Sequence, residues 1–214
     1  RQVKKILNQG INIILIITVP ATMGIIVLSE PIVRIFFQRG AFDSNATIMT
    51  SQAFIFYSLG LVGASLRLML NRVFYAFHDT KTPMLNGAFA VGLNIILNLI
   101  LIRFMAHSGL ALATSISATF TTLLLFLSLR RKIGPIGLRN YLKCFLKVLF
   151  ASIVMGILVY FIYFGLTANL ISSTIGEFVI LIMSIGIGAS IYFILCSILR
   201  VKEVRLLFKG LIRK

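Results

Sequence analysis

Residues 82–132 read TPMLNGAFAVGLNIILNLILIRFMAHSGLALATSISATFTTLLLFLSLRRK. Two apolar runs, residues 82–102 and 110–129, stand on either side of a short segment that contains Arg103 and His107. Each run has about 20 residues, the length that an α-helix needs to cross about 30 Å of hydrocarbon. Their apolar side chains occur all round the helix rather than along one stripe, which is typical of helices surrounded by lipid and protein.

Four further apolar runs of similar or greater length continue this pattern along the rest of the chain: residues 10–29, 47–77, 144–166 and 177–199. Hydrophobic residues make up 59% of the 214 residues and charged residues 12%, whereas a soluble chain carries about 25% charge. The mean hydropathy is +1.03, and a soluble domain of this size could not bury so much apolar surface. We therefore predict an all-α polytopic membrane protein with six transmembrane helices.

The positive charges lie in the connections between the apolar runs. Twenty-one Lys and Arg against five Asp and Glu give a net charge of +16, which in a soluble protein would suggest a nucleic-acid partner. Here we expect none, because sixteen basic residues fall on one side of the six-helix topology and three on the other. Basic loops face the cytoplasm, so both termini, including the tail at residues 200–214, are predicted to be cytoplasmic.

One segment is too short and too charged to be a seventh span. Residues 31–42 read PIVRIFFQRGAF and carry Arg34 and Arg39 among apolar side chains. This pattern predicts a short amphipathic helix at the outer membrane interface. A continuation of the first helix, bent at Pro31, is an equally good interpretation.

The sequence offers no catalytic constellation. Its two histidines, His78 and His107, fall on opposite sides of the predicted membrane, and no paired carboxylates or nucleotide-binding loop are present. Cys144 and Cys196 are expected to pack as small apolar residues. We therefore predict no enzymatic activity.

Two arginines lie within the second apolar run, where an ionisable side chain is costly unless it faces protein or water. Arg72 stands near the cytoplasmic end of this run, and Arg67 lies five residues deeper, about 7.5 Å along a helix. Both side chains can extend to the cytoplasmic headgroups. Alternatively, Arg67 faces an aqueous cavity and attracts an anionic substrate.

A second polar set lies in the third and fourth runs. Asn94 and Asn98 are four residues apart and therefore share one helix face, and the next run carries six hydroxyl residues between positions 114 and 122. Amides facing hydroxyls can link helices by hydrogen bonds worth about 0.6 kcal/mol each. The other interpretation is an oxygen-lined cation site, since hard cations prefer such ligands.

Several segments resemble, in order, the C-terminal part of the MurJ/MviN lipid II flippases, which belong to the multidrug/oligosaccharidyl-lipid/polysaccharide exporter superfamily. The resemblance is specific from residue 1 to about residue 131 and looser beyond. Its segments are PATMG (20–24), SEPIVRIFFQRGAF (29–42), FYSLGL (56–61), RVFYAFHDTKTP (72–83), NIILN (94–98) and GLALATS (109–115).

The resemblance implies a fold of fourteen spans, built as two six-helix lobes plus two terminal helices. This chain would supply spans nine to fourteen, and the N-terminal lobe would precede it. Residues 1–132 would form a four-helix part of the C-terminal lobe. Residues 133–214 would form the two terminal helices with the basic tail. Upstream DNA is expected to encode about eight more apolar spans in frame.

The implied activity is alternating access that moves lipid-linked peptidoglycan precursor, lipid II, from the inner to the outer leaflet of the bacterial cytoplasmic membrane. Membrane lipids and the N-terminal lobe are the other implied partners. A cationic cavity would hold the pyrophosphate and sugar head, with Arg67 and Arg72 as candidate substrate-binding residues, and a groove near the last two helices would hold the lipid tail. Two other functions stay open: a flippase for another undecaprenyl-linked polysaccharide intermediate, and a membrane scaffold that does not transport.

Members of this family are also described with a sodium site. The resemblance places its ligands at Asn94, Asn98, Thr114 and the Leu110 carbonyl, together with one helix that would lie upstream. In sodium-binding relatives a carboxylate can occupy the position of Asn98. Its replacement by an amide here implies a weaker site.

Overall fold

The computed structural model describes residues 2–134, 138–170, 174–199 and 201. The predicted basic tail therefore lies outside the described residues, apart from Val201. The described residues form helices without strands. In chain order these helices are α1 (Gln2–Phe37), α2 (Ser44–Leu59), α3 (Leu61–Ala76), α4 (Lys81–Ile133), α5 (Leu138–Leu170) and α6 (Thr174–Ile198).

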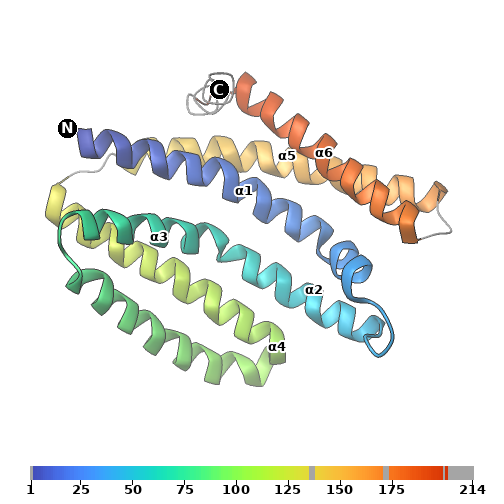
Figure 1. The fold of residues 1–214 in the computed structure, drawn as a ribbon, viewed down its shortest axis with the longest axis horizontal. Coiled ribbons are helices and arrows are strands. Elements are labelled where there is room, and N and C mark those ends of the chain that lie inside the picture. Colours follow the sequence, from blue (N-terminus) through green and yellow to red (C-terminus); the bar gives the residue numbers. More distant parts are fainter. Residues whose placement is uncertain (1, 135–137, 171–173, 200, 202–214) are drawn as a thin grey trace.

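Helix α1 continues beyond the first apolar run, through Pro31, to Phe37. Its last turns bend away from the rest of the helix (Figure 1), as expected where proline removes a backbone hydrogen bond. Of the two interpretations of residues 31–42, the structure shows the continuation of the first helix, which extends α1 through residues 31–37, and a separate interfacial helix is wrong for these residues. Residues 38–43 connect α1 to α2.

The second predicted span is broken. Helices α2 and α3 meet at Gly60 with a bend of 41°. A Cβ atom at Gly60 would lie 2.6 Å from the Ser115 Oγ and 2.7 Å from its Cα, so only glycine permits this approach. Ser115 in turn donates its hydroxyl to the carbonyls of Phe56 and Tyr57, just before the break.

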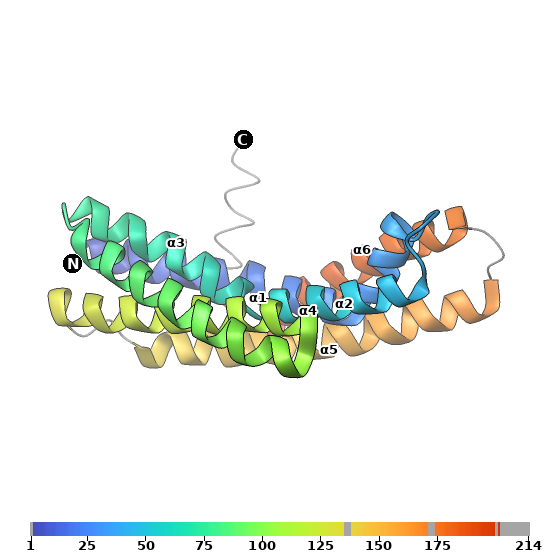
Figure 2. The ribbon, with the colours of Figure 1, turned by 90° about the horizontal axis from the view of Figure 1, so that it is seen from below.

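Helix α4 contains both the third and the fourth predicted spans. Its 53 residues would extend about 80 Å as one straight helix, far more than the hydrocarbon thickness. At Ala106 the backbone leaves helical geometry (φ 47°, ψ −126°), and Figure 1 and Figure 2 show the chain returning alongside itself. We call residues 81–105 the first arm of α4 and residues 107–133 its second arm.

Helix α1 lies at the centre of the bundle and contacts α2, α3, α5 and α6. Its buried side chains recur every three or four residues, and so do those of α5, which is its most extensive partner. Among the described residues, α5 and α6 approach the remaining helices mainly through α1. The α5–α6 pair therefore forms one side of the molecule and α2–α4 the other (Figure 1).

Large apolar side chains cover the outside of the bundle, which is expected of a surface that faces lipid. Phe104 is 80% exposed, and Phe89 and Phe161 are each 67% exposed. By length and composition, four described helices can cross a membrane: α1, α4, α5 and α6. The bent pair α2 and α3 makes a fifth if it is counted as one span.

Candidate functional site

The two arms of α4 bring four sequence-predicted residues together in one chain of hydrogen bonds. Asn98 donates its Nδ2 to the Asn94 Oδ1 at 3.0 Å, and Asn94 donates its Nδ2 to the Thr114 Oγ1 at 3.4 Å. The Thr114 hydroxyl donates to the Leu110 carbonyl at 2.9 Å. We call these residues the polar cluster. Its first two members come from the first arm and the other two from the second.

One oxygen of the polar cluster has no partner. The Asn98 Oδ1 is buried and accepts no hydrogen bond from the described residues. An unpaired buried acceptor is costly, so this atom is suited to a ligand. The cluster offers amide, hydroxyl and backbone carbonyl oxygens, which are hard ligands for a cation. The described residues contain no group of three His, Cys, Asp or Glu that could hold a metal ion instead.

The hydroxyls of the second arm divide between two faces. Thr114 faces the amides, whereas Ser115 and Thr122 bond the backbone of α2 and α3. Thr122 donates to the Gly63 carbonyl at 2.6 Å. The two interpretations of the polar spans therefore apply to different residues. Of the six hydroxyls, Ser115 and Thr122 join helices, Thr119 and Thr121 bond carbonyls within α4, and only Thr114 belongs to the polar cluster.

The candidate substrate-binding arginines lie on different sides of α3. Arg67 is half-buried and adjoins the buried face that carries Leu66 and Leu70. Arg72 is exposed. It follows Arg67 by five residues, which places the two side chains about 140° apart around the helix axis. Within the described part of the chain no ion pair holds either guanidinium, and no hydrogen bond joins them to the polar cluster.

The turn between α3 and α4 holds a charged pair outside the apolar segments. The Lys132 Nζ lies 2.6 Å from the Asp79 Oδ2, and Asp79 also accepts hydrogen bonds from the Thr82 amide and hydroxyl. The bond from Lys132, followed by the bonds from Thr82, lowers the pKa of Asp79 from 3.8 to about 2. This ion pair links the second arm of α4 to the turn that precedes the first arm.

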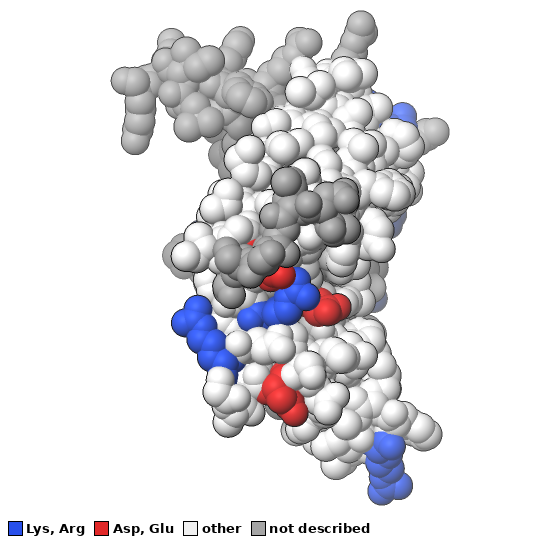
Figure 3. Space-filling model, turned by 90° about the vertical axis from the view of Figure 1, so that its right-hand side faces the viewer, with Lys and Arg blue, Asp and Glu red and all other residues white. Residues whose placement is uncertain are grey.

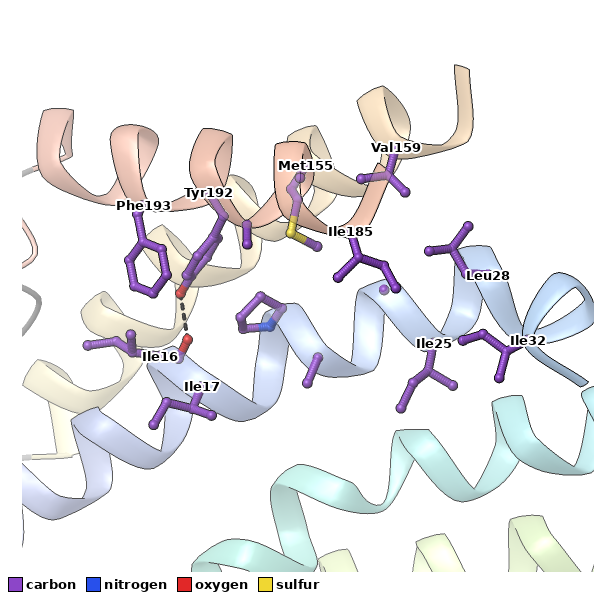
Figure 4. Close-up of a pocket in the computed structure, with 15 residues that line it drawn as sticks. Ile16, Ile17, Ile25, Leu28, Ile32, Met155, Val159, Ile185, Tyr192 and Phe193 are labelled. Atoms are coloured by element: carbon purple, nitrogen blue, oxygen red, sulfur yellow. Dashed lines mark hydrogen bonds between the residues drawn. The ribbon is translucent and has the colours of Figure 1, made fainter. Parts of the chain in front are cut away.

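An apolar groove runs between α1 and the terminal pair α5 and α6. It has a volume of about 360 Å³, and Figure 4 shows its lining. At one end the Tyr192 hydroxyl donates to the Ile16 carbonyl at 2.8 Å. Near the middle, a Cβ atom at Gly24 would meet nothing within 4 Å, so this glycine leaves space open. The groove lies beside the last two helices, α5 and α6.

The ionic contact at the other end of this groove was not predicted from the sequence. Arg34, predicted to lie either on an interfacial helix or on a bent continuation of the first helix, pairs with Glu177 of α6 at 3.4 Å. The available signals were an arginine within an apolar segment and an acidic residue at the start of an apolar run. Neither signal identifies its partner.

The helical bundle, its apolar exterior and its half-buried amides define a polytopic α-helical membrane protein with polar groups inside its spans. A family model described as "Lipid II flippase MurJ" matches residues 1–198. The chain therefore belongs to the MurJ family of lipid II flippases.

Similar proteins cover most of this chain. A probable lipid II flippase MurJ of Rickettsia prowazekii is 37% identical over 157 residues, or 73% of this chain and 31% of the relative. The lipid II flippase MurJ of Thermosipho africanus is 36% identical over 192 residues, or 90% and 37%. That of Rhizobium tropici, a probable lipid II flippase, is 30% identical over 220 residues, or 100% and 40%.

The fold has a counterpart among solved structures. The lipid II flippase MurJ in an inward closed conformation superimposes with a TM-score of 0.73 at 34% sequence identity. The match covers 91% of this chain and 38% of that structure. The chain thus spans 31% to 40% of the length of these relatives. These matches do not favour the two alternatives, a flippase for another polysaccharide intermediate or a scaffold.

Proposed function

We propose that this chain is the C-terminal portion of a lipid II flippase, which moves lipid-linked peptidoglycan precursors from the inner to the outer leaflet by alternating access. The observation that carries the proposal is the match to a MurJ structure over 91% of the chain at 34% identity. Alternating access requires two halves that move against each other, so the N-terminal lobe is part of the proposed machine.

We further propose six crossings with both termini in the cytoplasm. The crossings are α1, the bent pair α2 and α3, each arm of α4, α5 and α6. Each arm of α4 has about 25 residues, enough for a 30 Å core, which supports counting them separately. The excess of basic residues on one side supports the orientation. The two proposed domains, residues 1–132 and 133–214, divide at the end of α4.

The lipid substrate has an anionic head and a long apolar tail, and the chain offers a candidate site for each. Arg67 is proposed to attract the pyrophosphate, because this residue is half-buried and no acidic partner neutralises its guanidinium in the described structure. Arg72 is proposed as a second cation at the edge of the substrate site, since it is exposed on another side of α3. The groove between α1, α5 and α6 is proposed to hold the tail, since its lining is apolar.

The polar cluster is proposed as a weak sodium site. Asn94, Asn98, Thr114 and the Leu110 carbonyl supply its oxygens, and the unpaired Asn98 Oδ1 supports this assignment. The ligand set here is neutral, and a neutral set holds a cation less tightly than one containing a carboxylate.

The experiment compares Arg67→Ala with Arg72→Ala in the protein expressed from its gene, in cells depleted of their own flippase. At matched expression, Arg67→Ala is expected to rescue growth poorly and Arg72→Ala to rescue it well. Equal rescue by both variants would remove Arg67 from the substrate site. Accumulation of an undecaprenyl-linked intermediate other than lipid II, in depleted cells, would contradict the proposed substrate.

A further inference from the structure

We call the apolar groove between α1, α5 and α6 the tail groove. A single arginine joins these three helices at one end of it. The Arg34 Nη2 lies 3.4 Å from the Glu177 Oε2 of α6, and it donates a hydrogen bond to the Tyr163 hydroxyl of α5 at 3.4 Å. Beside it, the rings of Phe36 and Phe178 meet edge to face, with centroids 6.0 Å apart. We call Arg34, Glu177 and Tyr163 the clamp.

The bend in α1 places the clamp. Arg34 and Phe36 lie beyond Pro31, in the last turns of α1, which turn toward the terminal helix pair. Figure 3 shows this end of the molecule, where basic and acidic side chains lie together on a surface that is otherwise largely uncharged. A charged pair on such a surface specifies which parts of two helices meet.

The clamp lies at one limit of the tail groove. Ile32 lines the groove, and Arg34 lies two residues beyond it. At the opposite limit Tyr192 of α6 bonds the Ile16 carbonyl of α1 (Figure 4). Helix α6 is thus tied to α1 at both ends of the groove. The 18 residues from Ile16 to Arg34 correspond to about 27 Å of helix, close to the thickness of the hydrocarbon core.

The two ties differ in strength. The Tyr192 side chain is 2% exposed, so its hydrogen bond is shielded from water. The side chains of Arg34 and Glu177 are 39% and 27% exposed, and ion pairs that are partly exposed are weak. The clamp is therefore the end of the groove that opens more easily.

We propose that Arg34 is a positioning residue, which holds the Glu177 end of α6 against α1 and closes that end of the tail groove. Opening of the clamp lets the lipid tail pass between α1 and α6 at the outer leaflet. This inference rests on the proposed function, because only a lipid substrate gives the groove an occupant.

The clamp is tested by the distance between α1 and α6 in the purified full-length protein. Spin labels are attached to cysteines at two exposed positions, Phe37 and Ile175, which flank the clamp. A control pair at Ile17 and Ile194, also exposed, reports the opposite end of the groove. The two cysteines of this chain, Cys144 and Cys196, are buried.

Arg34→Gln and Glu177→Gln are each expected to lengthen and broaden the distance at the clamp and to leave the control pair unchanged. The exchange of charges, Arg34→Glu with Glu177→Arg, is expected to restore it. Tyr163→Phe removes only one hydroxyl and is expected to give a smaller change. An unchanged distance in Arg34→Gln, or no restoration by the exchange, would overturn the proposal.

Delivery of lipid II to the outer leaflet is measured in the same variants. Each single variant is expected to lower delivery about two- to fivefold, the range expected for a partly exposed ion pair, and the exchange to recover it. A lengthened distance with unchanged delivery would overturn the positioning role. Absence of delivery by the unaltered protein would contradict the proposed function, while the distances would still decide whether the clamp exists.

Discussion

The addition of a single methyl group at Gly109 should push the two arms of α4 apart. A Cβ atom at Gly109 would lie 2.5 Å from the Leu101 carbonyl oxygen and 2.7 Å from its carbon, both of them backbone atoms that cannot rotate away. Ordinary contact begins near 3.4 Å, so Gly109→Ala must move the arms apart by roughly 0.9 Å. The Asn94–Thr114 hydrogen bond is already 3.4 Å long and would then break.

The energetic effect of Gly109→Ala has two parts. Overpacking of this kind costs about 1–3 kcal/mol, whereas replacing glycine by alanine inside a helix gains up to about 1 kcal/mol. Gly92→Ala in the first arm is the matched control, because its Cβ would meet nothing within 4 Å. The difference between the two variants isolates the steric part, so Gly109→Ala should be less stable than Gly92→Ala by about 1–3 kcal/mol.

The assay is reversible unfolding of the purified protein in detergent micelles, with both variants measured against the unaltered protein. Gly92→Ala is expected to be slightly stabilised and Gly109→Ala destabilised. Equal stability of the two variants would refute the close approach of the arms at Gly109, and with it the geometry of the polar cluster.

Three further perturbations test other parts of the structure. Because the pKa of Asp79 is lowered to about 2, its ion pair with Lys132 should stabilise the fold above pH 4 and lose this effect as the pH falls toward 2. Asp79→Asn should remove this acid-sensitive part of the free energy of unfolding. Asn98→Asp should increase the stabilisation of the fold by sodium, whereas Asn86→Asp, outside the polar cluster, should not. A bound ion stabilises a fold by about 2.7 kcal/mol when its concentration is a hundredfold above Kd. Equal responses of the two variants would contradict the sodium site. Gly24→Leu should fill the tail groove and weaken binding of undecaprenyl phosphate in micelles, and Gly186→Leu, which faces open space on α6, serves as the control.

The all-helical class could be predicted from apolar runs of membrane length, but the helix breaks within these runs could not. The run at residues 47–77 contains a glycine at position 60, yet many membrane helices carry such a glycine without breaking. The break depends on Ser115, which approaches Gly60 and bonds the carbonyls before it. Contacts between residues so far apart in sequence leave no periodic pattern.

The same limit applied to the candidate site. The spacing of Asn94 and Asn98 placed both amides on one face, and in the structure the two amides are hydrogen-bonded to each other. Thr114 was indicated by the family resemblance rather than by spacing. Residues 31–37 were ambiguous because a proline can end a helix or only bend it, and tertiary contacts of Arg34 with α5 and α6 accompany the bent form.

We propose that this chain helps to carry lipid II across the inner membrane. The most direct test of this proposal is the amount of lipid II in the outer leaflet, measured with an externally added enzyme that cleaves only this lipid. The measurement is made in flippase-depleted cells that express the gene encoding this chain. We expect outer-leaflet lipid II to return with the unaltered gene and to stay low with Arg67→Ala at equal expression. Restoration of growth without any return of lipid II to the outer leaflet would contradict this function.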